Sequence, residues 1–102
     1  MIGVDIVDLS RITEDEAFVS RILTPEEREE LVTRGSQSRR IEYIGGRFAA
    51  KEALFKATGE TACLTWPVLN DPEGKPYVKG HPEIAVSISH DGGLAIAAVQ
   101  IP

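Results

Sequence analysis

Two acidic residues stand where apolar neighbours make a charge costly. Asp5 interrupts the apolar run Ile2–Val7, and Glu52 lies among the alanines and phenylalanines of residues 47–56. A carboxylate removed from water is usually held by a cation, a metal ion or hydrogen-bond donors. Lys56 follows Glu52 by four residues, which places both on one face of a helix. The pattern indicates a hard metal ion held by the two acids, with a cation beside it for an anion.

Taken alone, the Glu52–Lys56 spacing is more typical of an ordinary helix pair, which contributes a few tenths of a kcal/mol. Asp5 could likewise cap a turn, although Asp8 is the more ordinary residue for that purpose. The metal-site interpretation therefore depends on further features of the chain.

Charge is unevenly distributed along the chain. Residues 34–56 hold six basic side chains and two acidic ones, a local charge of +4 in a protein whose net charge is −5. A compact basic patch on an acidic protein suits a phosphate ligand or an acidic protein partner. It suits duplex nucleic acid poorly, because a long polyanion would also meet the surrounding acids. A solvated helix face explains some of these charges equally well.

Length and composition predict one small domain over residues 1–102. The 102 residues allow a single core, and a hydrophobic content of 42% is ordinary for a globular protein. No apolar run approaches the ~20 residues of a membrane span, and no basic segment precedes an apolar one at the N-terminus. We expect a cytoplasmic protein without a membrane partner. The single Cys63 excludes an internal disulfide.

The elements that must position these residues fall into a helical half and a strand-rich half. Thr24-Pro25-Glu26-Glu27 is a strong helix start, with a Thr cap, a Pro in the first helical position and a Glu three residues after the cap. We predict a strand over Ile2–Val7, a short helix from a cap at Thr13 or Asp15 through Arg21, a helix from Pro25 to about Thr33, a mobile basic segment over Ser36–Arg40, and a central helix from about Ile41 to Thr58, stopped by Gly59.

Beyond Gly59 the apolar pattern changes from a period of 3.6 to a period of 2. We predict strands over Leu64–Leu69, Pro76–Val78, Ile84–Ser89 and Leu94–Ile101, with turns at Asn70–Gly74 and His90–Gly93. The expected fold class is α+β, with helices packed on a mainly antiparallel sheet.

Several charged side chains have plainer interpretations. Lys51 lies on the basic side of the central helix, so it either contacts a ligand or an interface or is solvated. The glutamates at 26, 27, 29 and 30 look like a solvated first helical turn favoured by the helix dipole. Trp66 and Tyr77 are expected to be packing residues. On a helical wheel, Ala49, Ala50, Ala53 and Ala57 form a flat face on which another backbone can pack closely.

Four motifs occur in order along nearly the whole chain. They are Gly3-x-Asp5 followed by Arg11, the run Gly46-Arg47-Phe48-Ala49-Ala50-Lys51-Glu52-Ala53-x-x-Lys56, then Gly74-Lys75-Pro76-Tyr77, and Ser87-Ile88-Ser89-His90. Each motif alone is weak. Together they closely resemble the holo-(acyl-carrier-protein) synthase family, the short type of 4'-phosphopantetheinyl transferase.

The resemblance implies transfer of 4'-phosphopantetheine from coenzyme A to a serine of an apo acyl carrier protein. It further implies a Mg²⁺ requirement, release of adenosine 3',5'-bisphosphate, and a homotrimer with active sites between subunits. By match to the family motifs, Asp5 and Glu52 are metal ligands, Lys56 contacts phosphate, and Arg11 helps to dock the carrier protein. The coenzyme A site matches Arg39, Arg47, His90 and the loop Gly74, Lys75 and Pro76. His90 opens a glycine-rich turn and could instead be structural.

The residue types suit this chemistry. Mg²⁺ commonly takes only one or two protein carboxylates and completes its shell with phosphate oxygens and water. Guanidinium groups such as those of Arg39 and Arg47 are well shaped for the ribose phosphate. Glu52 or a bound water could take the proton of the serine, and the sequence leaves this choice open.

The chain also departs from the family pattern. It is shorter than usual in the first helical region, after Gly59, and between Tyr77 and Ile84. Glu60 stands where relatives usually carry a second glycine, which puts an acid near the expected phosphate site. The shortened loops motivate an alternative function, a non-catalytic module of the same fold that docks a carrier protein. The intact Asp5, Glu52 and Lys56 argue against that alternative.

Overall fold

The computed structural model describes the whole chain, residues 1–102, as three helices, a three-stranded sheet and a separate two-stranded sheet. The helices are α1 (Glu16–Ile22), α2 (Pro25–Leu31) and α3 (Gln37–Thr58), and the strands are β1 (Ile2–Asp8), β2 (Val68–Asn70), β3 (Pro76–Val78), β4 (Ala85–Asp91) and β5 (Leu94–Gln100). Short 3₁₀ turns span Leu9–Arg11 and Thr61–Thr65. The predicted α+β class is confirmed.

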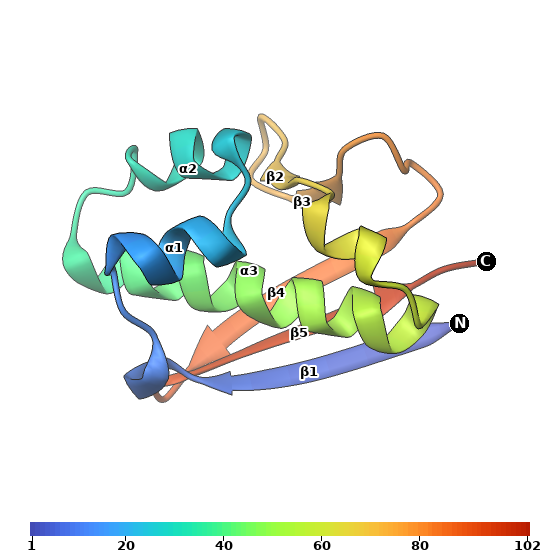
Figure 1. Ribbon diagram of the computed structural model, residues 1–102, viewed down its shortest axis with the longest axis horizontal. Coiled ribbons are helices and arrows are strands. Elements are labelled where there is room, and N and C mark those ends of the chain that lie inside the picture. The colour runs from blue at the N-terminus through green and yellow to red at the C-terminus, as the bar shows by residue number, and fades with distance from the viewer.

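Helix α3 is the centre of the molecule, with the main sheet on one side and the other elements opposite (Figure 1). The Ser36 side chain accepts a hydrogen bond from Arg39 N at its start, and Gly59 adopts the left-handed conformation at its end with a φ of 72°. The predicted alanine face is buried. A Cβ on Gly3 would lie 1.9 Å from the Ala53 carbonyl oxygen, so β1 approaches α3 this closely only because residue 3 is glycine.

The main sheet is antiparallel, in the order β1-β5-β4. Its residues alternate between two faces, as strand geometry requires. Val7, Ala97 and Val99 are buried on the face that packs on α3. The opposite face exposes large apolar side chains from β1 and β5, namely Ile2, Val4, Ile6, Leu94 and Ile96. This second face has no partner within the chain.

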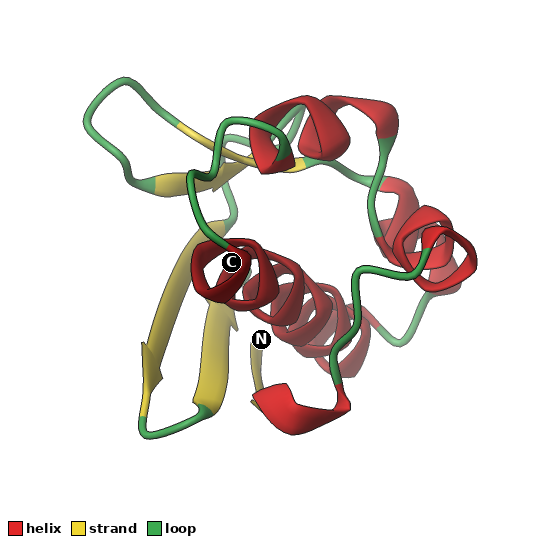
Figure 2. Cartoon of the chain, turned by 90° about the vertical axis from the view of Figure 1, so that its left-hand side faces the viewer, coloured by secondary structure: helices red, strands yellow, loops and turns green.

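The hairpin β2–β3 forms its own two-stranded sheet and shares no strand pairing with the main sheet. Seen along α3, the hairpin and helices α1 and α2 surround the side of α3 that faces away from β1, β4 and β5 (Figure 2). Val68 and Val78 anchor the hairpin in the single hydrophobic core, which α3 dominates. None of the helices combines the length and the apolar character that crossing a bilayer requires.

Three predicted boundaries are wrong. His90 and Asp91, expected in a turn, belong to β4 and pair with β5. Residues from Gln37 onward already belong to α3, because Ser36 caps the helix, so the segment expected to be mobile is mostly helical. The strand expected over residues 64–69 is shorter, and only Val68–Asn70 pair with β3. Pro67 has no N–H to give to a strand ladder, and the preceding residues form the 3₁₀ turn Thr61–Thr65 instead.

Candidate active site

Asp5 and Glu52 line one small cavity, although 47 positions separate them in the sequence. Asp5 comes from the middle of β1 and Glu52 from the middle of α3, and the close approach at Gly3 brings these elements together. The cavity measures about 260 Å³ and is lined by Asp5, Ile6, Val7, Arg11, Ile12, Phe18, Phe48 and Glu52. Arg11, the predicted docking residue, is therefore part of the same cavity. One side of the cavity is formed by the stacked rings of Phe18 and Phe48.

Lys56 pairs with Asp5 rather than with Glu52. Its Nζ lies 3.0 Å from Asp5 Oδ1 and 3.0 Å from the Val4 carbonyl oxygen. The Asp5 side chain is 16% exposed and that of Lys56 is 54% exposed, so the ion pair opens to solvent on the lysine side. The Glu52 carboxylate lines the cavity and makes no hydrogen bond or ion pair within the chain. It is thus available to a ligand.

The two carboxylates suit a hard divalent cation that brings other ligands with it. Nowhere in the chain do three or more His, Cys, Asp or Glu side chains gather as a complete metal site. Mg²⁺ does not need such a set, because it takes few protein ligands and keeps waters or substrate oxygens. Asp5 and Glu52 therefore fit Mg²⁺ and would not enclose a zinc ion, which needs at least three protein ligands.

A second, larger cavity gathers most of the residues expected to bind coenzyme A. It measures about 500 Å³ and is lined by Thr33, Arg34, Arg39, Glu42, Tyr43, Gly46, Arg47, Asn70, Gly74, Pro76, Ile88 and His90. Arg39, Arg47, Gly74, Pro76 and His90 were selected from the sequence. Lys75 is exposed and lines a neighbouring cavity with Pro76 and β4 instead. His90 Nδ1 lies 3.3 Å from Glu42 Oε2 at the cavity wall.

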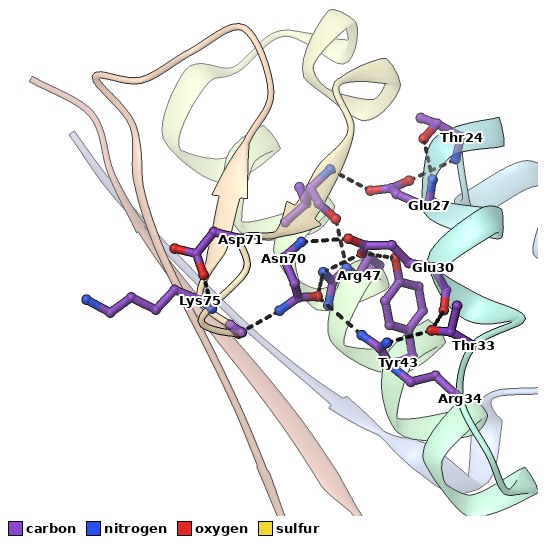
Figure 3. Close-up of polar contacts among 12 residues, drawn as sticks. Thr24, Glu27, Glu30, Thr33, Arg34, Tyr43, Arg47, Asn70, Asp71 and Lys75 are labelled. Carbon is purple, nitrogen blue, oxygen red and sulfur yellow. Dashed lines mark hydrogen bonds and ion pairs between the residues drawn. The ribbon is translucent and has the colours of Figure 1, made fainter.

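Arg47 is a buried part of this wall and is only 5% exposed. Its Nε donates to the Val68 carbonyl at 2.9 Å, and its Nη2 donates to Asn70 Oδ1 and to Glu30 Oε1 (Figure 3). Burial lowers the pKa of the Arg47 guanidinium from its usual value, although the nearby Glu30 opposes this shift. Nη1 alone has no partner within the chain. Most of the hydrogen-bonding capacity of Arg47 therefore holds the protein together.

Tyr43 also lines this cavity, and Glu30 holds Tyr43 and Arg47 in place without lining it; neither residue was predicted from the sequence. The Tyr43 ring contacts two guanidinium groups, with Arg34 Cζ at 4.7 Å and Arg47 Cζ at 4.1 Å from its centroid. Its hydroxyl donates to Glu30 Oε1 at 2.7 Å. Burial raises the pKa of Tyr43, so this hydroxyl keeps its proton. The periodicity of α2 does not identify Glu30, because its partners lie on other elements.

Lys51 is neither a ligand contact nor a solvated side chain, and both expectations for it are wrong. It is 4% exposed, and its Nζ lies 2.8 Å from Oε1 of the fully buried Glu27. The same Glu27 Oε1 accepts from Thr24 N in the predicted capping box, while Oε2 accepts from Val68 N at 2.7 Å. The expectation of a solvated first helical turn is thus wrong for Glu27. The local charge of +4 is partly neutralised by these buried acids from α2.

The two cavities have no lining residue in common. The carboxylates Asp5 and Glu52 therefore do not face Arg39 and His90 across a shared space within one chain. Glu60, which was expected near a phosphate site, is exposed and lines neither cavity.

Comparison with known proteins gives consistent matches over the whole chain. Residues 1–99 match the model of the 4'-phosphopantetheinyl transferase superfamily. The chain is 47% identical to the holo-(acyl-carrier-protein) synthase of Halalkalibacterium halodurans, over 95% of this chain and 90% of that protein. It is 44% identical to the corresponding protein of Chlorobium luteolum, over 95% of this chain and 94% of that protein.

Solved structures agree with the sequence matches. A holo-(acyl-carrier-protein) synthase from Bacillus anthracis in complex with coenzyme A (3',5'-ADP) superposes with a TM-score of 0.84 at 40% identity, covering 96% of this chain and 91% of that one. The Helicobacter pylori enzyme in complex with coenzyme A gives a TM-score of 0.79 at 30% identity, covering 100% of both chains.

Proposed function

Because the chain belongs to the holo-(acyl-carrier-protein) synthase family, within the 4'-phosphopantetheinyl transferase superfamily, we propose that it modifies an apo acyl carrier protein with 4'-phosphopantetheine from coenzyme A. A serine oxygen of the carrier protein forms a bond to the β-phosphorus of coenzyme A. The bond from that phosphorus to its bridging oxygen breaks, and adenosine 3',5'-bisphosphate leaves. The observation that carries the residue assignment is the cavity shared by Asp5 and Glu52.

Asp5 and Glu52 would hold Mg²⁺ in this cavity. When bound, the ion neutralises negative charge that develops on the pyrophosphate as its bond breaks. Lys56 fixes one oxygen of Asp5 through the 3.0 Å ion pair and leaves the other oxygen free for the metal. Because Lys56 is half-exposed, its remaining donor can bind a phosphate oxygen at the same time.

The serine must also lose a proton during the transfer. Glu52 has no partner in the chain, so its carboxylate is free to accept that proton directly or through a water molecule. Arg11 on the rim of the cavity supplies a positive charge for the acidic surface of a carrier protein. Its exposed side chain makes no ion pair, which leaves it available for docking.

The larger cavity would bind the adenosine bisphosphate portion of coenzyme A. Arg39 is exposed and its side chain has no partner in the chain, so its guanidinium suits the ribose phosphate. His90 and the backbone around Gly74 and Pro76 complete the wall. Arg47 contributes chiefly by shaping this wall, because most of its donors are already engaged.

A homotrimer accounts for the separation of the two cavities. If coenzyme A lies across a boundary between two copies, the nucleotide cavity of one copy can face the carboxylates of the next. The exposed apolar face of the main sheet supports such an assembly, because a continuous patch of this kind usually marks a protein interface. Ile2 and Ile6 are 76% and 59% exposed in the single chain.

Binding of coenzyme A with and without Mg²⁺, measured by calorimetry, separates this enzyme from a docking module. We expect coenzyme A to bind and Mg²⁺ to strengthen the binding, since the carboxylates and the pyrophosphate share the ion. A module that only docks carrier proteins has no need of the nucleotide. A folded protein that binds an apo carrier protein but no coenzyme A would contradict the proposal.

A further inference from the structure

The hairpin β2–β3 carries one wall of the larger cavity but shares no strand pairing with the main sheet. Polar side chains from α2 and α3 hold it instead. Glu27 and Glu30, one helical turn apart on α2, accept hydrogen bonds from Val68 N at 2.7 Å and Asn70 N at 2.8 Å, two residues apart on β2. The same two glutamates pair with Lys51 and Arg47 on α3. The position of the wall is therefore set by side chains.

Asn70 stands where these contacts converge (Figure 3). Its Oδ1 accepts from Nη2 of Arg47 and, at 3.3 Å, from Nη2 of Arg34. Its Nδ2 donates to the Gly74 carbonyl at 2.8 Å, across the turn of the hairpin. One amide group thus joins α3, the segment after α2, and the turn. Gly74 has a φ of 90°, a backbone conformation that glycine adopts readily. Because glycine is also conformationally free, the hydrogen bond from Asn70 is needed to hold the turn in one position.

We propose that Asn70 is a positioning residue for the nucleotide of coenzyme A. Its amide fixes the distance between the Gly74–Pro76 wall and the Arg47 wall of the cavity, and thereby sets the shape that the nucleotide meets. The inference rests on the proposed function, since it assumes that this cavity binds coenzyme A. Asn70 does not take part in the chemical step, because the carboxylates lie in the other cavity.

Two substitutions distinguish the role of the Asn70 amide oxygen, which accepts, from that of its amide nitrogen, which donates. Asn70→Asp keeps an oxygen for Arg47 and Arg34 but loses the donor to Gly74 and places a negative charge against its carbonyl. Asn70→Ala loses both the acceptor for the two arginines and the donor to Gly74. We expect both variants to bind adenosine 3',5'-bisphosphate about tenfold more weakly in calorimetry, as the loss of one ordinary hydrogen bond implies. Glu73→Gln, in the same turn but outside the cavity, should bind as the unchanged protein does.

Kinetics and stability distinguish positioning from a general structural role. In both Asn70 variants the KM for coenzyme A should rise about tenfold, with kcat and the KM for the carrier protein within about twofold of the unchanged protein. The urea midpoint should fall for Asn70→Ala and fall less for Asn70→Asp, whose carboxylate keeps the contacts with Arg34 and Arg47. The inference is overturned if Asn70→Asp binds the nucleotide normally, if affinity follows stability across the variants, or if kcat falls while KM stays constant.

These outcomes can be told apart from failure of the proposed function. If the unchanged protein binds the nucleotide but transfers nothing, the proposed function fails and the binding comparison between variants still decides the role of Asn70. If the unchanged protein transfers phosphopantetheine and Asn70→Asp matches it in KM, only the inference fails. If the unchanged protein does not bind the nucleotide, both fail.

Discussion

At the scale of residues, the chemistry depends on which partner each charged group finds. Helical spacing predicts an ion pair between Glu52 and Lys56. In the structure Lys56 pairs with Asp5 instead, because β1 runs beside α3. This exchange leaves Glu52 without a partner, which a helical wheel cannot predict. The types and positions of the three residues could be identified from the motifs, whereas their pairing depends on a contact between residues 51 positions apart.

The first prediction concerns Glu52. Glu52→Gln removes one of the two carboxylates and should lower the rate of phosphopantetheine transfer by at least about 100-fold, the range typical for loss of a group that acts in the transition state. The circular dichroism spectrum should not change, because Glu52 makes no structural contact. Glu29→Gln, at an exposed position without hydrogen bonds, serves as the control. Retained activity in Glu52→Gln would show that this carboxylate is not a metal ligand.

The second prediction concerns pH. Asp8 caps the turn after β1, and its hydrogen bond from Ser10 N, with help from Arg11, lowers the pKa of its carboxyl group. A lowered pKa in the folded state means that Asp8 contributes stability above its ordinary pKa, and that this contribution is lost as the pH falls through the folded-state value. Asp8→Asn keeps a capping oxygen but does not titrate, so its free energy of unfolding should fall less steeply in acid.

The measurement is an NMR titration of the Asp8 carboxyl carbon combined with urea unfolding at several acidic pH values. Titration of Asp8 at or above the ordinary value for aspartate would contradict this account of the turn.

At the scale of elements, α2 is the segment whose role sequence patterns describe least well. Its capping box at Thr24 and Glu27 was predicted and is confirmed. Its glutamates were expected in solvent, as their position in the first turns of a short helix suggests. The partners that bury Glu27 and engage Glu30 lie 13 to 41 positions away, so no local pattern reports them.

The third prediction tests the buried pair between α2 and α3. Lys51→Met leaves the buried carboxylate of Glu27 without its cation, and should lower the free energy of unfolding by about 3–5 kcal/mol. Urea denaturation followed by circular dichroism gives this value. Lys79→Met removes the exposed pair with Glu26 and should change stability little. Equal effects of the two substitutions would mean that burial adds nothing to the Lys51–Glu27 pair.

The fourth prediction tests the contact between β1 and α3. Gly3→Ala puts a Cβ 1.9 Å from the Ala53 carbonyl oxygen, so the strand must move away from the helix. The free energy of unfolding should fall by about 3 kcal/mol. Transfer should also slow, because Asp5 and Glu52 lie on the two elements that separate. Gly35→Ala, which has no atom within 4 Å of its Cβ, should be nearly neutral in thermal unfolding. An equally small effect at Gly3 would refute the close approach.

At the scale of the whole molecule, the strand alternation and the helix caps suffice to predict the fold class and most elements. The errors fall where a distant contact decides the burial of a side chain, as at Lys51, where a proline interrupts an apolar run, as at Pro67, or where a helix cap was not identified, as at Ser36. The residues around each cavity were mostly predicted from the motifs. Their division between two separate cavities was not, because it depends on how β4 and the β2–β3 hairpin lie around α3.

The fifth prediction tests assembly. Ile96→Glu places a charge on the central strand β5, in the exposed apolar sheet face and outside both cavities, so it should dissociate the proposed homotrimer and abolish transfer while the single chain stays folded. Sedimentation equilibrium measures the mass. Val32→Glu makes the same kind of change at a residue that is 78% exposed and lies outside the sheet, and should leave the trimer intact. A monomeric but fully active unchanged protein would contradict an active site shared between copies.

The central claim is that this chain transfers 4'-phosphopantetheine to a carrier protein with help from Mg²⁺. Mass spectrometry of intact apo acyl carrier proteins, incubated with the protein and coenzyme A, tests it most directly. A panel of carriers from fatty acid and polyketide pathways covers the range of partners. We predict that at least one carrier becomes heavier by one phosphopantetheine when Mg²⁺ is present and keeps its mass when a chelator removes the ion. Unchanged masses across the panel, with folded protein and Mg²⁺ present, would contradict the account.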